Sequence, residues 1–337
     1  MSPPGRPKGE YRSAQHEGIP VIARCLLALL SCLCCAAAVA LPAAPGACPP
    51  QPQPISAEQA QAGLREAHDH GFLWRIARDG RVSYLYGTVH VAQRQWLFPG
   101  PELVRAVKAS DTIALELDML DPDIQRRLAA GMQADPAEHL PDALAERLRA
   151  QVRAACLPAD EMAALAPAMQ LAALTTLVAR WDGLDPSYAI DSFLAGFGRG
   201  LGKAVVSLES PEMQIALLKG DPNTAEQELD HGLQQLEQGQ MRPMLVRISR
   251  VWADGKEDEL ERYEKWCGCA DTDAERAELK RMLDDRNGPL AERIDALHRS
   301  GQRVFAAVGA LHMVGPHGLP RLMAARGYSV QRVELPR

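Results

Sequence analysis

Two histidines close the same tetrapeptide pattern, Gly-x-x-His, near opposite ends of the chain. His90 ends Gly-Thr-Val-His at residues 87–90, and His312 ends Gly-Ala-Leu-His at residues 309–312. Each tetrapeptide follows a short run, 82–86 or 304–308, with the aromatic and β-branched content of a buried strand. Because ligands bind outside the carboxyl ends of strands in open parallel sheets, we expect both histidines to line one crevice.

Two carboxylates stand in the same relation to apolar runs. Glu116 ends the run 112–116 and Glu209 ends the run 204–209. Imidazole nitrogens and carboxylate oxygens are ligand types that suit zinc, manganese or a similar divalent ion, so the set of four side chains predicts a metal-assisted hydrolase. The alternative interpretation is structural: the histidines are hydrogen-bonded scaffold residues and the glutamates cap the helices that follow.

The motifs around these residues closely resemble those of the TraB/PrgY/GumN family, which includes the TIKI metalloproteases. The resemblance is carried by residues 83–90 and 308–315, and it covers about residues 70 to 337. It continues through shorter matching segments, at 115–118, 189–191, 207–209, 252–255 and 286–287.

The resemblance implies an α/β fold, with a mostly parallel sheet flanked by helices as in erythromycin esterase and the ChaN haem-binding lipoprotein. Charged, amphipathic segments at 223–239 and 255–265 predict a helical insertion or lid over one edge of the sheet.

The resemblance also implies a hydrolytic centre in which His90, Glu116 and His312 hold a divalent ion, whether manganese, cobalt or zinc. Glu209 would be a general base or a further ligand, and Arg286 would stabilise developing negative charge.

Two further residues, Asp191 and Asn287, match the family pattern with less certain roles.

The favoured activity is hydrolysis of an amide bond in a peptide or protein, by resemblance to TIKI. A non-catalytic protein that binds haem, a metal or a small ligand is one alternative, and an accessory factor in surface polysaccharide production is another. The presence of both Glu116 and Glu209 favours an enzyme, because hydrolysis needs a free base near the attacking water, whereas haem capture needs only an axial ligand and an apolar slot.

The N-terminal region has the pattern of a secretory signal peptide. Basic residues precede an apolar stretch, and small residues at 38–40 suit cleavage, which gives a signal peptide at 1–40. A Pro/Gln-rich lead at 41–69 and one α/β domain at 70–337 follow, with a helical insertion at about 222–266. We therefore expect a periplasmic or secreted protein. An uncleaved membrane anchor is the alternative, whereas a lipoprotein attached at Cys32 fits poorly because a leucine stands where smaller residues are usual.

Four cysteines remain after removal of the signal peptide: Cys48, Cys156, Cys267 and Cys269. In an oxidising compartment they allow two disulfides. Cys267 and Cys269 are so close in sequence that we expect each to pair elsewhere or one to stay free.

Composition narrows the partners. The formal charge of −6 argues against a nucleic-acid-binding protein, which would normally carry a basic patch. The expected partner is a peptide or protein substrate, with membrane contact only through an uncleaved signal segment. The sequence leaves the oligomeric state open.

Three local patterns allow direct structural tests. The run 162–179 lacks charge, yet Pro167 predicts a broken helix pair and not a membrane span. Residues 196–203 look like a phosphate-binding loop but precede a strand, so we interpret them as a helix exit and turn. The segment 68–70, His-Asp-His, reads as a solvated approach to the first hairpin.

Overall fold

The structure, a computed structural model, describes residues 48–336. The predicted signal peptide at 1–40 and residues 41–47 of the predicted lead lie outside the described residues. Among residues 48–336, no helix is both long enough and apolar enough to span a membrane.

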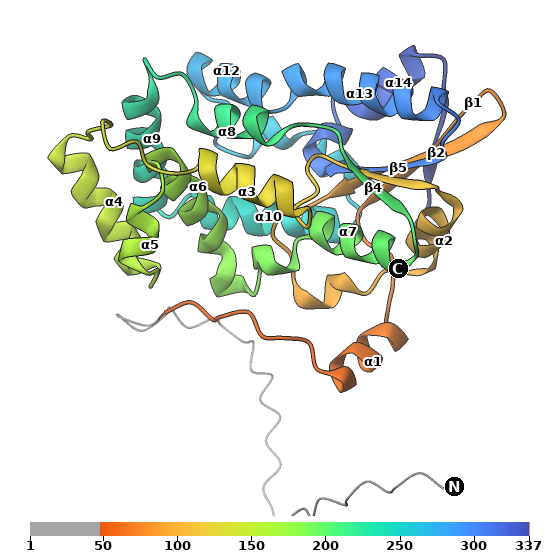
Figure 1. The fold of residues 1–337 in the computed structure, drawn as a ribbon, viewed down its shortest axis with the longest axis horizontal. Helices are drawn as coiled ribbons and strands as arrows, with labels where there is room; N and C mark the ends of the chain where they lie inside the picture. The colour runs from red at the N-terminus through yellow and green to blue at the C-terminus, as the bar shows by residue number, and fades with distance from the viewer. Residues whose placement is uncertain (1–47, 337) are drawn as a thin grey trace, which may run out of the picture. The chain divides into compact units, whose positions relative to one another are not determined.

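The core is a six-stranded mixed sheet with the strand order β4-β3-β5-β2-β1-β6 (Figure 1). The strands are β1 Phe72–Arg78, β2 Arg81–Thr88, β3 Thr112–Leu115, β4 Ala204–Ser207, β5 Val304–Gly309 and β6 Ser329–Val333. The four strands β4, β3, β5 and β2 pair in parallel, whereas β1 pairs antiparallel with both β2 and β6. The predicted α/β class with a mostly parallel sheet is confirmed.

Helices cover both faces of this sheet, which explains why its central strands are apolar throughout. Figure 1 shows α13 (Asp284–Arg299) and α14 (Leu319–Ala325) above the sheet and α7 (Ile190–Gly200) below it. The contacts agree, since α13 packs on β5 and α14 on β6, while α7 packs on β3, β4 and β5. All four residues of β3 are buried. The apolar runs recognised in the sequence are therefore core strands that helices cover on both faces.

The remaining helices connect the strands and build a second apolar cluster. The α-helices are α1 Ala57–Arg65, α2 Pro101–Ala109, α3 Pro122–Gly131, α4 Asp142–Ala154, α5 Ala159–Ala163, α6 Pro167–Leu177, α8 Pro211–Lys219, α9 Ala225–Glu237, α10 Met241–Ala253, α11 Glu257–Leu260 and α12 Asp273–Met282. Short 3₁₀ helices are η1 Arg94–Leu97, η2 Val178–Asp182, η3 Pro186–Tyr188, η4 Tyr263–Lys265 and η5 Ala310–Met313. The second cluster joins α4, α5, α6 and α9 through buried residues such as Leu148, Met162 and Leu229.

Two of the local predictions are confirmed. The uncharged run 162–179 is divided between α5 and α6, with Pro167 at the first position of α6, where its missing N–H costs no intrahelical hydrogen bond. Residues 196–203 are the last turns of α7 and the turn into β4, not a phosphate loop.

The prediction of a solvated segment at 68–70 is wrong for Asp69. Asp69 is only 2% exposed, and its carboxylate accepts hydrogen bonds from the backbone N–H groups of Glu102 and Leu103, at 3.0 and 2.8 Å. Asp69 therefore caps the first turn of α2, whose own N-cap residue, Gly100, has no side chain to do so.

Both disulfides that four cysteines allow are present, but the expected pairing of Cys267 and Cys269 is wrong. Cys48 bonds to Cys156, and Cys267 bonds to Cys269 across a single residue. Gly268 adopts a positive φ of 64°, which turns the chain so that the two Cα atoms lie 5.1 Å apart. That separation is ordinary for a disulfide.

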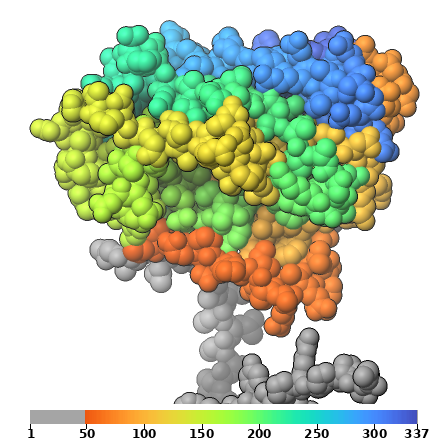
Figure 2. Space-filling view, in the orientation of Figure 1, coloured from red at the N-terminus to blue at the C-terminus, as the bar shows by residue number. Residues whose placement is uncertain are grey.

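The described part of the lead lies against the domain. Figure 2 shows this segment, in orange, along the lower edge of the green helices. Tyr188 joins the two, because its hydroxyl accepts the backbone N–H of Gln53 at 3.0 Å and donates to the Gln53 carbonyl at 3.1 Å.

Candidate functional site

The four predicted strand-end residues lie at one edge of the sheet. Glu116 directly follows β3, and Glu209, His90 and His312 lie two to three residues beyond β4, β2 and β5. Because these strands are parallel neighbours, their carboxyl ends coincide. The backbone also links the two glutamates, since the Glu209 N–H donates to the Glu116 carbonyl at 3.0 Å.

Arg286, in the first turn of α13, connects three of these side chains. Its Nε and Nη2 donate to the two Glu209 carboxylate oxygens at 2.9 and 2.6 Å, and Nη2 also bonds to Glu116 Oε2. Nη1 donates to His312 Nε2 at 3.1 Å. One guanidinium thus bridges two carboxylates that would otherwise repel each other in a buried place.

His312 is buried and fixed in one orientation. Its ring is 3% exposed, and Nδ1 lies 2.7 Å from Asn287 Oδ1. An amide oxygen only accepts, so Nδ1 carries the proton and Nε2 is left as the acceptor that meets Arg286. Burial lowers the pKa of His312 to about 4, despite the nearby carboxylates, and the ring is therefore neutral at pH 7.

His90 is the solvent-facing member of the set. Its side chain is 60% exposed, and Nδ1 lies 3.1 Å from Asp191 Oδ2 in the first turn of α7. The Asp191 carboxylate raises the pKa of His90 to about 9, so the ring is protonated on both nitrogens at pH 7. A bond from the Ile190 N–H to the Val89 carbonyl at 3.1 Å holds α7 against the segment that carries His90. The sequence did not show whether Asp191 points inward; here it orients His90.

Glu116 is kept ionised. Burial alone would raise its pKa, but His312, His90 and Arg286 together with the Gly309 N–H lower it to about 2. The Gly309 N–H donates to Glu116 Oε1 at 2.7 Å. Gln214, from α8, donates to Glu209 Oε2 at 3.0 Å.

Close approach favours glycine at the first position of both tetrapeptides. A Cβ on Gly309 would lie 3.2 Å from Glu116 Oε1 and 3.9 Å from His90 Nε2. A Cβ on Gly87 would lie 3.1 Å from the Ala310 Cα, so the backbone of the second tetrapeptide would have to shift by a few tenths of an ångström. Glycine therefore lets the two Gly-x-x-His segments pack together at the site.

Two supporting residues were not assigned roles from the sequence. Gln214 bonds to the carboxylate pair, and no motif marked it. Trp252 lay in a family-like segment, at 252–255, and its fully buried indole donates Nε1–H to the Gly87 carbonyl at 2.7 Å. That bond fixes the backbone of the first tetrapeptide from the side of α10.

A protein-family model, described as the TraB/PrgY/gumN family, matches residues 72–332. The chain belongs to the TraB/PrgY/gumN family. The matched range contains every strand of the sheet apart from the last residue of β6, together with all five predicted site residues. Searches of curated protein sequences and of solved structures each gave no match.

The donor types at this TraB/PrgY/gumN site fit a divalent ion. In both histidines Nδ1 is held by an oxygen acceptor, so Nε2 is the nitrogen that would bind a metal, and metal-binding histidines are usually oriented in this way. His90, whose pKa is about 9, would first have to release its Nε2 proton. Glu116 adds carboxylate oxygens. Arg286 now bonds to Glu116 Oε2 and His312 Nε2, and within 48–336 no three His, Cys, Asp or Glu side chains are grouped as a metal cluster. A metal at these atoms therefore requires Arg286 to release both.

Proposed function

We propose that this TraB/PrgY/gumN protein is a metal-dependent hydrolase that acts on an amide bond of a peptide or protein. The observation that supports this most is the meeting of an open histidine, a buried neutral histidine, two carboxylates and an arginine at the carboxyl edge of four parallel strands. Such a set provides metal ligands, a base and a positive charge in one place.

His90, Glu116 and His312 are the residues that would hold the ion, in agreement with the ligand set implied by the family resemblance. When bound, a divalent ion lowers the pKa of a water molecule and polarises the substrate carbonyl. Asp191 and Asn287 support this role, because each accepts a hydrogen bond from Nδ1–H of its histidine. Nε2 is then the ring nitrogen that would bind the ion.

Arg286 and Glu209 supply the acid–base and charge components. In the present arrangement both Glu209 oxygens accept bonds from Arg286. When the Arg286 side chain moves away from Glu209, a Glu209 carboxylate oxygen becomes free to accept a proton as the general base. The same guanidinium is then available to stabilise negative charge that develops on the substrate. Breaking the Arg286–Glu209 contact thus makes Glu209 available as a base and Arg286 available to stabilise charge.

Export is part of the proposal. The N-terminal sequence has the signal pattern, and two disulfides within the described chain are typical of proteins from oxidising compartments. The substrate would then be an exported or extracytoplasmic peptide or protein.

The test is a cleavage screen with synthetic peptides of mixed sequence, in the presence of Mn²⁺, Co²⁺ or Zn²⁺, read by mass spectrometry. The proposal predicts cleavage by the wild type and loss of at least about a hundredfold in rate for His90→Ala and for His312→Ala, because loss of even an outer-shell partner of a metal ligand costs about 10–100-fold. His139→Ala is the matched control, because His139 is exposed on the segment between α3 and α4. Equal cleavage by all four folded proteins would contradict the assignment.

A further inference from the structure

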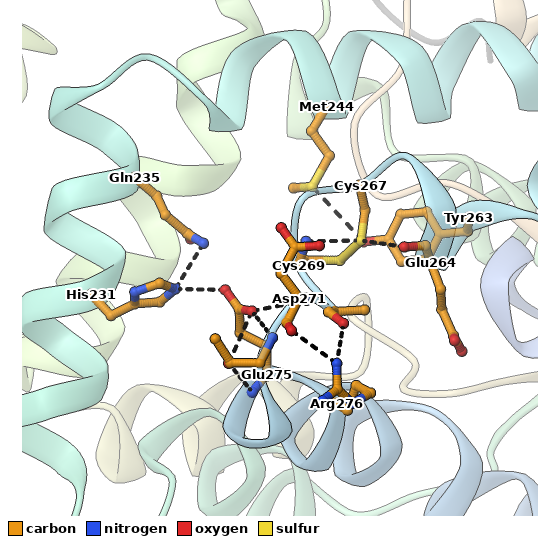
Figure 3. Close-up of a disulfide and its surroundings, with 12 residues drawn as sticks. His231, Gln235, Met244, Tyr263, Glu264, Cys267, Cys269, Asp271, Glu275 and Arg276 are labelled. Atoms are coloured by element: carbon orange, nitrogen blue, oxygen red, sulfur yellow. Dashed lines mark hydrogen bonds and ion pairs between the residues drawn. A yellow bond between two sulfur atoms is a disulfide. The ribbon is translucent and has the colours of Figure 1, made fainter.

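The Cys267–Cys269 disulfide lies in the loop between η4 and α12 (Figure 3). Both cysteines are half-buried and Gly268 between them is exposed, so the loop that carries the bond lies at the surface. The ring encloses one residue, Gly268. The proposed hydrolytic function gives this disulfide no role.

The disulfide contributes little as a structural link. The loop-closure entropy that a disulfide removes from the unfolded chain grows with the number of residues enclosed. A bridge between residues i and i+2 encloses a single residue, so its entropic contribution is small. Other bonds already fix the loop: Trp266 Nε1 donates to the Glu259 carbonyl at 3.0 Å, and Arg276 Nη1 donates to the Ala270 carbonyl at 2.7 Å. A reciprocal capping box between Thr272 and Glu275 holds the start of α12. The loop therefore keeps its anchors when the disulfide opens.

Each of the two sulfurs has a hydrogen-bond donor beside it, and the Cys269 N–H donates to Cys267 Sγ at 3.0 Å. The Tyr263 hydroxyl lies 3.3 Å from Cys269 Sγ and 3.9 Å from Met244 Sδ (Figure 3). Neither sulfur carries a hydrogen, so the hydroxyl is the donor, and Cys269 Sγ is the nearer acceptor. Tyr263 is 8% exposed, and burial raises its pKa to about 12, so it stays a protonated donor at any physiological pH. A thiolate released at Cys269 would be stabilised by this O–H group, and one released at Cys267 by the Cys269 N–H.

We propose that the Cys267–Cys269 disulfide is a thiol–disulfide exchange site that oxidises a dithiol in a peptide or protein. A substrate thiolate attacks Cys267 Sγ, the Cys267–Cys269 bond breaks, and Cys269 leaves as the thiolate beside Tyr263. The second substrate thiolate then attacks the substrate sulfur of the mixed disulfide and releases Cys267. Two electrons pass from the substrate dithiol to the protein, the substrate gains one disulfide, and both protein cysteines end as thiols once protonated.

The first experiment compares the two disulfides within one molecule. The chain, with Cys25, Cys32, Cys34 and Cys35 changed to serine, is equilibrated with increasing dithiothreitol, and each pair is assigned by alkylation and peptide mass spectrometry. Cys267–Cys269 is expected to open at a dithiothreitol concentration at least about tenfold lower than Cys48–Cys156, whose sequence separation is 108. Opening of both pairs together, or of Cys48–Cys156 first, would overturn the proposal.

The second experiment measures transfer to a substrate. A reduced synthetic peptide with two cysteines is mixed with the oxidised protein, and peptide disulfide is counted per chain. One disulfide per chain is expected for the wild type and none for the Cys267→Ser/Cys269→Ser variant. Tyr263→Phe, which keeps the ring, is expected to slow transfer about fivefold, the equivalent of one neutral hydrogen bond. Equal transfer by the double serine variant, or an unchanged rate in Tyr263→Phe, would contradict the proposed site or the proposed leaving sulfur.

Discussion

Arg286 is the residue on which the charge balance of the site depends. Its side chain and those of Glu116 and Glu209 are 13%, 9% and 3% exposed, so none of the three charges is well solvated. Two buried carboxylates with one shared cation are stable only while that cation is in place. The same bonds occupy the Glu116 and His312 atoms that would bind a metal. Arg286 therefore affects both the stability of the fold and the ability of the site to bind a metal.

Removal of this guanidinium should therefore be costly. Arg286→Leu is expected to lower the free energy of unfolding by about 3–5 kcal/mol, because it leaves buried carboxylates without a partner. Arg321→Leu is the matched control, since it breaks the exposed pair with Glu261 and should cost less than about 1 kcal/mol. Urea unfolding followed by circular dichroism measures both. Equal losses in the two variants would show that Arg286 does not carry this role.

The pairing of His90 with Asp191 gives a second prediction at this scale. Asp191→Asn removes the carboxylate that raises the pKa of His90 to about 9, so the pKa of His90 should fall toward the ordinary 6.5. The amide oxygen of asparagine can still accept the Nδ1–H bond, which separates the effect of charge from that of orientation. Proton NMR of the His90 ring as a function of pH reports the value, and a pKa that stays near 9 in the variant would rule out Asp191 as the cause.

At the scale of elements, the central strands were predictable and the supporting contacts were not. Residues 82–86, 112–116, 204–209 and 304–308 are short apolar runs because helices bury both faces of the sheet, and this pattern is visible in sequence. The roles of Asp69 and Gln214, and the bonds that Arg286 makes, depend on how α2, α8 and α13 are oriented on the sheet. No local pattern encodes that orientation. The Cys267–Cys269 bond was likewise missed because it depends on the backbone turn at Gly268.

The Cys48–Cys156 disulfide ties the described lead to the residues just after α4. It closes a loop across a sequence separation of 108, for which chain entropy alone predicts about 4.7 kcal/mol of stabilisation. Cys48→Ser/Cys156→Ser is expected to lose about 2–5 kcal/mol in urea unfolding. Cys267→Ser/Cys269→Ser, which opens the smaller ring, should lose less. A loss in the first variant no larger than in the second would mean that the lead is held by other contacts, such as those at Tyr188.

For the whole molecule, stability should fall as the solution is acidified below neutrality. His312 has a pKa of about 4 when folded and an ordinary 6.5, and Glu116 has about 2 against an ordinary 4.5. Between its folded-state pKa and its ordinary pKa, each group binds more protons in the unfolded chain than in the folded protein. Each group therefore stabilises the fold above its ordinary pKa, and this stabilisation is lost as the pH falls to its folded-state pKa. The contribution from His312 is therefore lost between pH 6.5 and 4.

Urea midpoints at pH 7, 5.5 and 4 measure this effect, with His312→Gln as the comparison because glutamine does not titrate. The wild type should lose more stability between pH 7 and 4 than the variant does. Parallel pH profiles for the two proteins would show that His312 is not the buried neutral group described here.

The central claim is that His90, Glu116 and His312 form one divalent-metal site in a TraB/PrgY/gumN hydrolase. The most direct measurement is metal content by plasma mass spectrometry, after equilibration with Mn²⁺, Co²⁺ or Zn²⁺ and removal of free ions, for the wild type and a folded His90→Ala/His312→Ala variant. The account predicts about one ion per wild-type chain, held by these ligands, and none in the variant. A wild type that retains none of the three metals, or a variant that retains as much as the wild type, would contradict it.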